Sequence, residues 1–298
     1  MKMKQKILLS AVIGGLGGIA AWSPVEGALH LQNQMHSIIL ANILFGVIAG
    51  IIFGFFLGSI EGVLFKSGAK LRKGIFWGML LGIIGGAFGL FAGRFIIVVT
   101  GDIFFRMKQW YSPVILVLIK SAGWSIFGAA IGVSGGIVLR SKGKILQGAL
   151  GGLTGGFIGG LAFELIVYQS SAVHIARLFG LTLMGLLIGL FLALAEKILS
   201  QGVLRLLNGK MKGKEFDLSY NRIKIGRSES CDVGLFGFKN VVNRHAEIKK
   251  EEGGFVIYDA EAPEGTLVNE QPVKQKNLKS GDIIQLGDAK MLFLAKEN

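Results

Sequence analysis

The sequence has one cysteine, four prolines and few charged residues, and each shortage excludes a class of protein. Asp, Glu, Lys and Arg make up 17% of the 298 residues, whereas apolar residues make up 51%. Four prolines beside 46 glycines exclude a collagen-like chain, and the high hydrophobicity excludes intrinsic disorder. The lone Cys231 excludes an internal disulfide and fits a reducing compartment.

Acidic residues are scarce from the N-terminus to Lys214, and the net charge of this part is strongly positive. Residues 1–214 carry 20 basic and 5 acidic residues, and residues 215–298 carry 12 and 14. The total of +13 therefore arises wholly from the apolar part, where basic residues set membrane orientation. Because the polar tail has no basic surplus to neutralise phosphates, we expect no nucleic-acid partner.

Six apolar segments predict an α-helical membrane domain over residues 1–204, in contact with a lipid bilayer. The first segment follows three lysines, but its end is a poor cleavage site, so we interpret it as a short span rather than a signal peptide. Whether this first segment crosses fully is left open. The segments cover residues 6–23, 37–60, 74–100, 112–139, 145–168 and 177–197.

The basic residues beside these segments predict that both chain ends lie in the cytoplasm. Fifteen belong to one set of loops and three to the other, and Lys and Arg are enriched on the cytoplasmic side. We therefore expect a multi-pass protein of a prokaryotic plasma membrane. The fifteen are Lys2, Lys4, Lys6, Lys66, Lys70, Arg72, Lys73, Arg140, Lys142, Lys144, Lys197, Arg205, Lys210, Lys212 and Lys214, and the three are Arg106, Lys108 and Arg177.

The membrane part repeats a glycine pattern. In residue number, the second segment matches the fourth at an offset of 74, and the third matches the fifth at an offset of 70. A fainter copy at Gly185, Gly189 and Ala193, with residues 10–18 resembling the odd-numbered segments, predicts three helical hairpins. Glycine at every fourth position forms a glycine-zipper face that packs helices closely in lipid or joins copies into a homo-oligomer.

Three ionisable residues, Arg94, Lys120 and Glu164, lie within the apolar segments, toward their non-cytoplasmic ends. A charged residue at the centre of a span is costly and often functional. At these outer positions, snorkelling or an ion pair with Glu164 is sufficient to accommodate them. We therefore expect their neutralisation to affect assembly more than ion flux.

The polar tail changes pattern. Residues 205–214 form a basic linker that we expect to lie against anionic headgroups. Residues 215–298 contain short apolar runs about every ten residues, separated by turn residues, and this spacing predicts an antiparallel β-sandwich.

Five loop motifs follow in order along this tail. They are Gly226-Arg227-Ser228, Cys231-Asp232-Val233, Asn243-Arg244-His245-Ala246, Gly265-Thr266-Leu267-Val268-Asn269 and Leu278 to Gly287. Together they resemble a forkhead-associated (FHA) domain, over residues 215–298 only. We identify no family for the membrane part.

This resemblance implies a sandwich of about eleven strands whose loops at one end bind a phosphothreonine peptide. It assigns peptide and phosphate contacts to Arg227, Ser228, Asn243 and Arg244, since a guanidinium group is a planar, permanently charged donor. It assigns support of the loops to Gly226, His245, Gly265, Thr266 and Asn269.

Two positions depart from the family pattern. Val242 replaces a serine whose hydroxyl meets the phosphate, and Glu264 replaces an asparagine. A carboxylate 5 to 6 Å from a phosphate, at an effective dielectric of about 20, is repelled by roughly 3 kcal/mol per unit charge. This is comparable to the contribution of a charge-assisted arginine contact.

These observations favour a non-enzymatic protein without a cofactor or metal, because no catalytic or metal-binding motif is present. The main interpretation is a membrane-anchored scaffold that recruits a protein partner, one candidate being a phosphothreonine protein of a Ser/Thr kinase signalling pathway. A transporter or channel gated by the tail, and a phosphate-independent assembly factor with a degenerate FHA domain, stay open as alternatives.

Overall fold

The computed structural model describes residues 3–32, 38–65, 67–106, 113–139, 141–218, 222–228, 231–252 and 254–295. Lys2, Lys66, Lys108 and Arg140, which entered the predicted orientation, lie outside these ranges. The chain divides into two compact units. The helical unit comprises residues 7–140 and 145–195, and the C-terminal unit comprises residues 1–6, 141–144 and 196–298.

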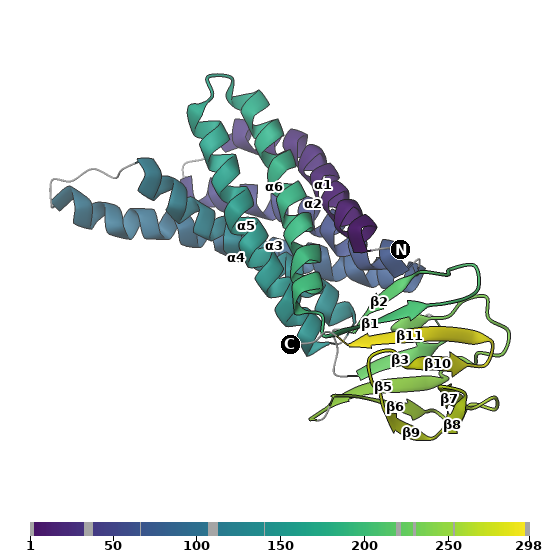
Figure 1. The fold of residues 1–298 in the computed structure, drawn as a ribbon. Helices are drawn as coiled ribbons and strands as arrows, with labels where there is room; N and C mark the ends of the chain where they lie inside the picture. The colour runs from purple at the N-terminus through teal and green to yellow at the C-terminus, as the bar shows by residue number, and fades with distance from the viewer. Residues whose placement is uncertain are drawn as a thin grey trace. The chain divides into compact units, whose positions relative to one another are not determined.

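The six predicted segments form six helices, which is the predicted α-helical region (Figure 1). Each contains a stretch long and apolar enough to cross a membrane. The first helix is longer than predicted and continues through Pro24, with Val25 buried in the core. The helices are α1 (Met3–Gln32), α2 (Ile38–Phe65), α3 (Gly68–Arg106), α4 (Pro113–Val138), α5 (Lys142–Gln169) and α6 (Val173–Leu199).

Glycines on α2 and α3 bring the two backbones into direct contact. A Cβ atom added to Gly50 would lie 2.0 Å from the carbonyl oxygen of Gly82, and one added to Gly54 would lie 2.2 Å from that of Gly78. No other residue fits at such distances without movement of a backbone. The four-residue glycine period therefore forms the seam between two antiparallel helices.

Two further helix pairs repeat this seam, α4 with α5 and α6 with α1. Equivalent contacts in the three pairs are Gly58 with Gly74, Gly132 with Gly148, and Gly189 with Ser10. These contacts relate both α2 to α4 and α3 to α5 by an offset of 74, so the offset of 70 predicted for the third and fifth segments is wrong by one helical turn. The same contacts relate α4 to α6 by an offset of 57.

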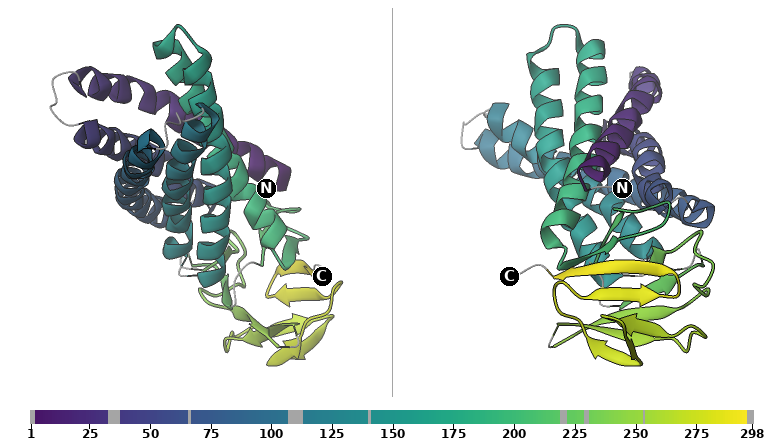
Figure 2. Two further views of the ribbon diagram at one scale, coloured as in Figure 1. Left: turned by 90° about the vertical axis from the view of Figure 1, so that its left-hand side faces the viewer. Right: turned by 45° about the vertical axis from the view of Figure 1, so that its right-hand side comes forward.

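Neighbouring helix pairs are in contact with one another, and α1 packs against α6. Glycines also mark the α3–α4 contact, where Gly89 meets Gly123, and the α5–α6 contact, where Gly155 meets Ile188. The right-hand view of Figure 2 shows α5 and α6 side by side, joined by their short loop. The largest fully buried side chains of this unit come from α2, α4 and α6. They include the repeat-equivalent residues Phe53, Phe127 and Met184 and their neighbours Trp124, Ile131, Leu181 and Ile188.

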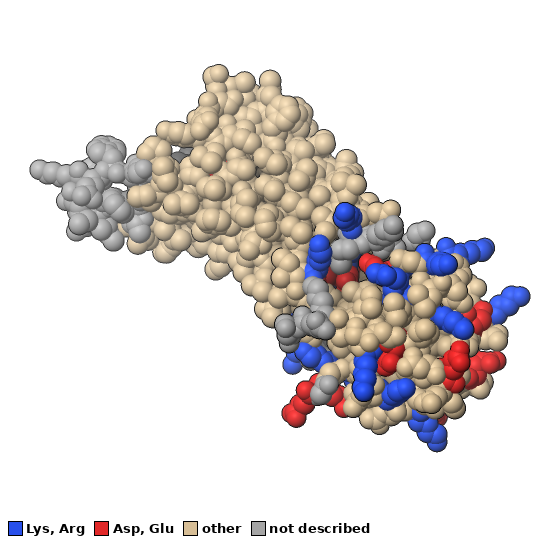
Figure 3. All heavy atoms as spheres, in the orientation of Figure 1, with Lys and Arg blue, Asp and Glu red and all other residues tan. Residues whose placement is uncertain are grey.

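The outer surface of the helices is apolar. In the part of the chain that the structure describes, 30 of the 32 exposed large apolar side chains lie in α1 to α6. Figure 3 shows this face of the helices almost without charged side chains, whereas Lys, Arg, Asp and Glu cover the strands. A soluble protein rarely exposes so large a continuous apolar surface, so this surface fits contact with lipid.

The C-terminal unit contains the predicted sandwich, and its described residues form eleven strands in two sheets. The first sheet has the order β2-β1-β11-β10-β7-β8, and the second has the order β4-β3-β5-β6-β9. The strands are β1 (Gly202–Leu206), β2 (Glu215–Asp217), β3 (Arg222–Gly226), β4 (Val233–Gly234), β5 (Ala246–Glu251), β6 (Gly254–Asp259), β7 (Thr266–Val268), β8 (Gln271–Val273), β9 (Gln275–Asn277), β10 (Ile283–Leu286) and β11 (Ala289–Ala295).

The sandwich begins before the predicted boundary at Glu215. Strand β1 pairs with β11 from Gly202 to Leu206 and also with β2, so residues 205 and 206 are not part of a linker. Leu204 and Leu206 are fully buried, while Arg205 between them is exposed and pairs with Glu215. This alternation of buried and exposed residues is that of a half-buried strand. Of the predicted linker, residues 207–214 are the part that connects β1 to β2.

The seam between α2 and α3 predicts that Gly50→Ala destabilises the protein. The added methyl group meets the backbone of Gly82, and overpacking of this kind costs about 1 to 3 kcal/mol. Thermal unfolding of the full chain in detergent measures the change. Gly27→Ala is the matched control, because a Cβ there meets nothing within 4 Å and should leave the unfolding temperature unchanged or raised. Equal effects of the two substitutions would contradict the seam.

The position of β1 predicts different behaviour for two fragments. A fragment of residues 201–298 should fold, whereas a fragment of residues 215–298 should not, because it lacks β1 between β2 and β11 and the two buried leucines of that strand. Circular dichroism and urea titration distinguish a cooperative transition from its absence. A cooperative transition of the shorter fragment would show that β1 is dispensable.

Candidate functional site

The Gly-Arg-Ser loop after β3 is fixed to the loop before β5 by its backbone. The N–H of Arg227 donates to the carbonyl of Val242 at 3.0 Å, and the N–H of Ser228 donates to the carbonyl of Asn243 at 3.2 Å. Gly226 is buried, and a Cβ there would lie 2.3 Å from the Asn243 oxygen. Glycine is therefore required for the two loops to approach this closely.

The side chain of Arg227 is exposed above this junction. Within the described residues its guanidinium group has no hydrogen bond or ion pair. Asn243, also exposed, lies on the loop to which the Arg227 backbone is bonded. The structure thus brings a cationic donor fork and a carboxamide onto adjoining loops, which is the chemistry that an anionic or extended peptide requires.

His245 joins a third loop to these two. It is fully buried, its Nε2 lies 2.9 Å from the Gly265 carbonyl, and its Nδ1 lies 3.4 Å from the Val242 N–H. The neutral tautomer with its proton on Nε2 satisfies both partners, because Nδ1 accepts while Nε2 donates. The buried imidazole therefore connects the loop that ends at Gly265 to the loop that carries Val242.

The remaining loop-supporting residues lie around β7. The Thr266 hydroxyl donates to Asp259 Oδ1 at 2.6 Å. Asn269, with φ of 52°, donates to Asp282 Oδ1 at 2.8 Å, and its own Oδ1 accepts from the N–H of Ile283 at 2.8 Å. The Asn269 bonds hold the turn after β7 against the start of β10, and the Thr266 bond connects β7 to the end of β6.

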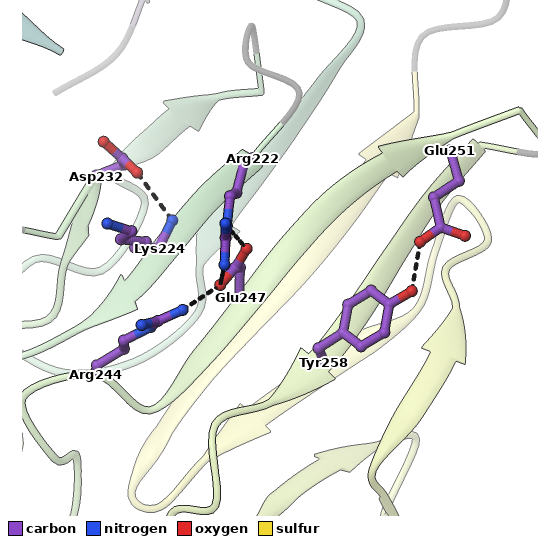
Figure 4. Close-up of polar contacts among 7 residues, drawn as sticks. All are labelled: Arg222, Lys224, Asp232, Arg244, Glu247, Glu251 and Tyr258. Atoms are coloured by element: carbon purple, nitrogen blue, oxygen red, sulfur yellow. Dashed lines mark hydrogen bonds and ion pairs between the residues drawn. The ribbon is translucent and has the colours of Figure 1, made fainter. Parts of the chain in front are cut away.

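Arg244, to which the resemblance assigns a peptide contact, forms an ion pair with Glu247. Its guanidinium donates to Glu247 Oε2 at 2.5 Å, and Arg222 donates to both oxygens of the same carboxylate (Figure 4). Burial raises the pKa of Glu247, but the hydrogen bonds from the two arginines outweigh it and hold the pKa below its ordinary value. The sequence did not single out Glu247, because a lone glutamate in a strand has no motif.

The two departures from the family pattern lie in this loop cluster. Val242 is half-buried, and its backbone N–H and carbonyl are both used in joining the loops. Glu264 is exposed in the turn before Gly265, whose φ is 64° and whose carbonyl faces His245. A phosphate at these loops would therefore find no hydroxyl at position 242 and a carboxylate in the turn beside the His245 partner.

A second polar cluster in the C-terminal unit was missed by the sequence interpretation. Glu196 is buried and forms ion pairs with Lys6 and Lys144, and Lys6 also lies 3.5 Å from Asp217 Oδ2. Burial raises the pKa of the Asp217 carboxyl, although Lys6 opposes this effect. The sequence pattern could not indicate this cluster, because its members come from four distant segments of the chain.

The pairing of Glu247 predicts a pH-dependent contribution to stability. Because its pKa is lowered in the folded state, the contribution is present above the unfolded value of about 4.5 and is lost as the pH falls through the folded value. Glu247→Gln should therefore destabilise residues 201–298 at pH 7, with a smaller difference from the wild type at pH 3.

Urea unfolding at both pH values measures this difference. Glu251→Gln is the control, since Glu251 is exposed and accepts a hydrogen bond from Tyr258 at the surface (Figure 4). A Glu247→Gln effect that does not change with pH would contradict the assigned role of the carboxylate.

Comparison with known proteins adds to this geometry. Residues 205–297 match the family model described as "Inner membrane component of T3SS, cytoplasmic domain". The oxoglutarate dehydrogenase inhibitor of Corynebacterium diphtheriae is 32% identical over 93 residues, which are 31% of this chain and 64% of the relative. The glycogen accumulation regulator GarA of Mycolicibacterium smegmatis is 35% identical over 86 residues, which are 29% of this chain and 54% of the relative.

Solved structures of FHA domains are also similar to the C-terminal region. The FhaA FHA domain, solved in complex with the intracellular domain of Rv3910, is 29% identical, with 31% of this chain and 98% of that chain covered and a TM-score of 0.29. A structure from a study of phosphothreonine-dependent FHA interactions is 27% identical, with 33% and 100% covered and a TM-score of 0.31.

The chain spans less than two thirds of the length of the two relatives named above. The family match begins inside β1 and leaves the six helices outside it. The loop motifs, the two-sheet sandwich and this match agree on the same residues, so the C-terminal domain of this protein is an FHA domain.

Proposed function

We propose that this protein is a membrane-anchored interaction module whose FHA domain recruits a protein partner to the cytoplasmic face of a bacterial inner membrane. The observation that carries the proposal is the exposed Arg227 side chain on a loop whose backbone is fixed by hydrogen bonds to residues 242 and 243. A rigid loop with an available cationic donor loses little conformational entropy when a ligand binds.

Membrane anchoring is supported by the six long apolar helices and their apolar outer surface. The excess of basic residues on one set of loops supports a cytoplasmic position for the FHA domain. The family that matches residues 205–297 is described as an inner membrane component with a cytoplasmic domain, which agrees with both assignments.

Recruitment without catalysis is supported by the names of two relatives, an enzyme inhibitor and a regulator of glycogen accumulation. We therefore propose a binding role for the FHA domain.

The contribution of phosphate to this binding is small in our proposal. Arg227 favours a phosphothreonine, but Val242 supplies no hydroxyl and Glu264 adds a negative charge to the turn before Gly265. Attraction and repulsion of about equal size, roughly 2 to 3 kcal/mol each, leave little net preference for the phosphorylated form.

Calorimetry of the full chain in neutral detergent tests the function, using a degenerate phosphothreonine peptide library and its unphosphorylated counterpart. We expect comparable weak affinities for both libraries, and loss of binding in Arg227→Ala. The double substitution Val242→Ser, Glu264→Asn should strengthen phosphothreonine binding by about tenfold or more, because it restores a donor and removes a repulsive charge.

Arg205→Ala is the matched control. Arg205 is an exposed arginine of the same domain that pairs with Glu215 in the six-stranded sheet, whereas Arg227 follows a strand of the five-stranded sheet. Strong wild-type binding that requires phosphate would replace our proposal with a phosphothreonine receptor. No binding in either the wild type or the double variant would favour the phosphate-independent assembly factor.

A further inference from the structure

A cavity of about 290 Å³ lies within the helical unit, and residues of all six helices line it. Its wall is mostly apolar and aromatic, with Phe45, Trp124 and Phe163 among the lining residues. Four charged side chains also line it, namely Arg94, Lys120, Glu164 and Arg177. A concave, largely apolar site with a few convergent charges is the usual form of a small-molecule site.

Two of the three helix pairs contain an ion pair at the same position. Lys120 on α4 donates to Glu164 on α5 at 2.9 Å, and Arg177 on α6 donates to Glu26 on α1 at 3.0 Å. The glycine contacts that relate the pairs also relate these residues, since the offset of 57 between Lys120 and Arg177 is the offset between Gly132 and Gly189. Each of these cations therefore has a carboxylate in its own repeat.

The third helix pair lacks the ion pair. The offset of 74 places Gly46 of α2 at the position of Lys120, and Leu90 of α3 at the position of Glu164. Both the cation and the carboxylate are thus missing. Gly46 packs against the backbone of Gly86, where an added Cβ would lie 2.2 Å from the carbonyl oxygen, and Leu90 lines the cavity. The third repeat therefore departs from the other two at a residue, Leu90, that lines the cavity.

Arg94 stands one helical turn beyond Leu90 and lines the cavity. Its Nε–H is buried and has no hydrogen-bond partner within the described residues. A buried guanidinium donor without an acceptor is costly, and an anion that enters the cavity would supply the acceptor.

Among the described residues that line the cavity, one positive charge has no negative charge beside it. Lys120 is neutralised by Glu164, which also accepts from Trp124 Nε1 at 3.3 Å, and Arg177 is neutralised by Glu26, which His174 also contacts. Arg94 remains without an acidic partner among these lining residues. We propose that the cavity binds a small organic monoanion, an oxyanion attached to an apolar body, with Arg94 holding the anionic group.

Two sources supply this chemistry, a free organic acid and the phosphodiester of an anionic lipid. Isothermal calorimetry of the full chain in neutral detergent uses octanoate for the first and dioctanoyl phosphatidylglycerol for the second. Octanol and dioctanoyl phosphatidylcholine are the probes without net charge. We expect at least one of the two anions to bind more tightly than its uncharged counterpart, and the one that does identifies the source.

Arg94→Gln should weaken this binding by about tenfold to a hundredfold, the range of a charge-assisted hydrogen bond. Arg72→Gln removes a cation from the same helix away from the cavity and should leave the affinity unchanged. A second variant, Leu90→Glu, places the carboxylate of the other two repeats one turn from Arg94. We expect this variant to fold, because the new carboxylate can pair with Arg94. We expect it to lose binding of the anion for the same reason.

Failure of both anions to bind more tightly than the uncharged probes would overturn the proposal. Equal anion affinity in the wild type, Arg94→Gln and Leu90→Glu would also overturn it. None of these outcomes bears on Arg227, so the anion site and the peptide site are tested separately.

Discussion

Direct contact between helix backbones at glycine is the constraint on which the helical unit depends. Where Gly50 meets Gly82 there is no room for a methyl group, so the register of the two helices is fixed. The same contact in two further pairs places chemically different residues at equivalent positions. The ion pairs, the buried aromatic centre and the cavity all depend on that register, because it decides which side chains of neighbouring helices meet. In lipid, dispersion packing rather than water exclusion holds the helices together.

The FHA domain depends on a different constraint, the satisfaction of backbone groups in its loops. Gly226 permits the approach, Arg227 and Ser228 donate from the backbone, and His245 joins the third loop from inside. Because backbone groups join the loops, the Arg227 side chain is left for a ligand. Changes at positions 242 and 264 can therefore alter what binds without altering the fold.

Both proposed sites share one physical feature, an arginine whose charge is not paired within the fold. Arg222 and Arg244 are held by Glu247, and Arg177 is held by Glu26, whereas Arg227 and Arg94 have no such partner within the described residues. A guanidinium group without an internal partner recognises oxyanions with directional hydrogen bonds. The ligands that we propose differ, a peptide at the loops of the FHA domain and a small organic anion in the apolar cavity.

The sequence alone determined the six helices, the two-part organisation and the FHA domain, because long apolar runs and ordered loop motifs are local signals. Tertiary structure decided which helices pair and in which register. A glycine pattern with a four-residue period looks the same after a shift of one turn, so the sequence could not separate an offset of 70 from one of 74. It also decided that Arg205 belongs to a strand, that Arg244 pairs with Glu247, and that Arg94 lines a cavity with no hydrogen-bond partner for its Nε among the described residues. Each of these depends on residues far apart in the chain, and only packing brings them together.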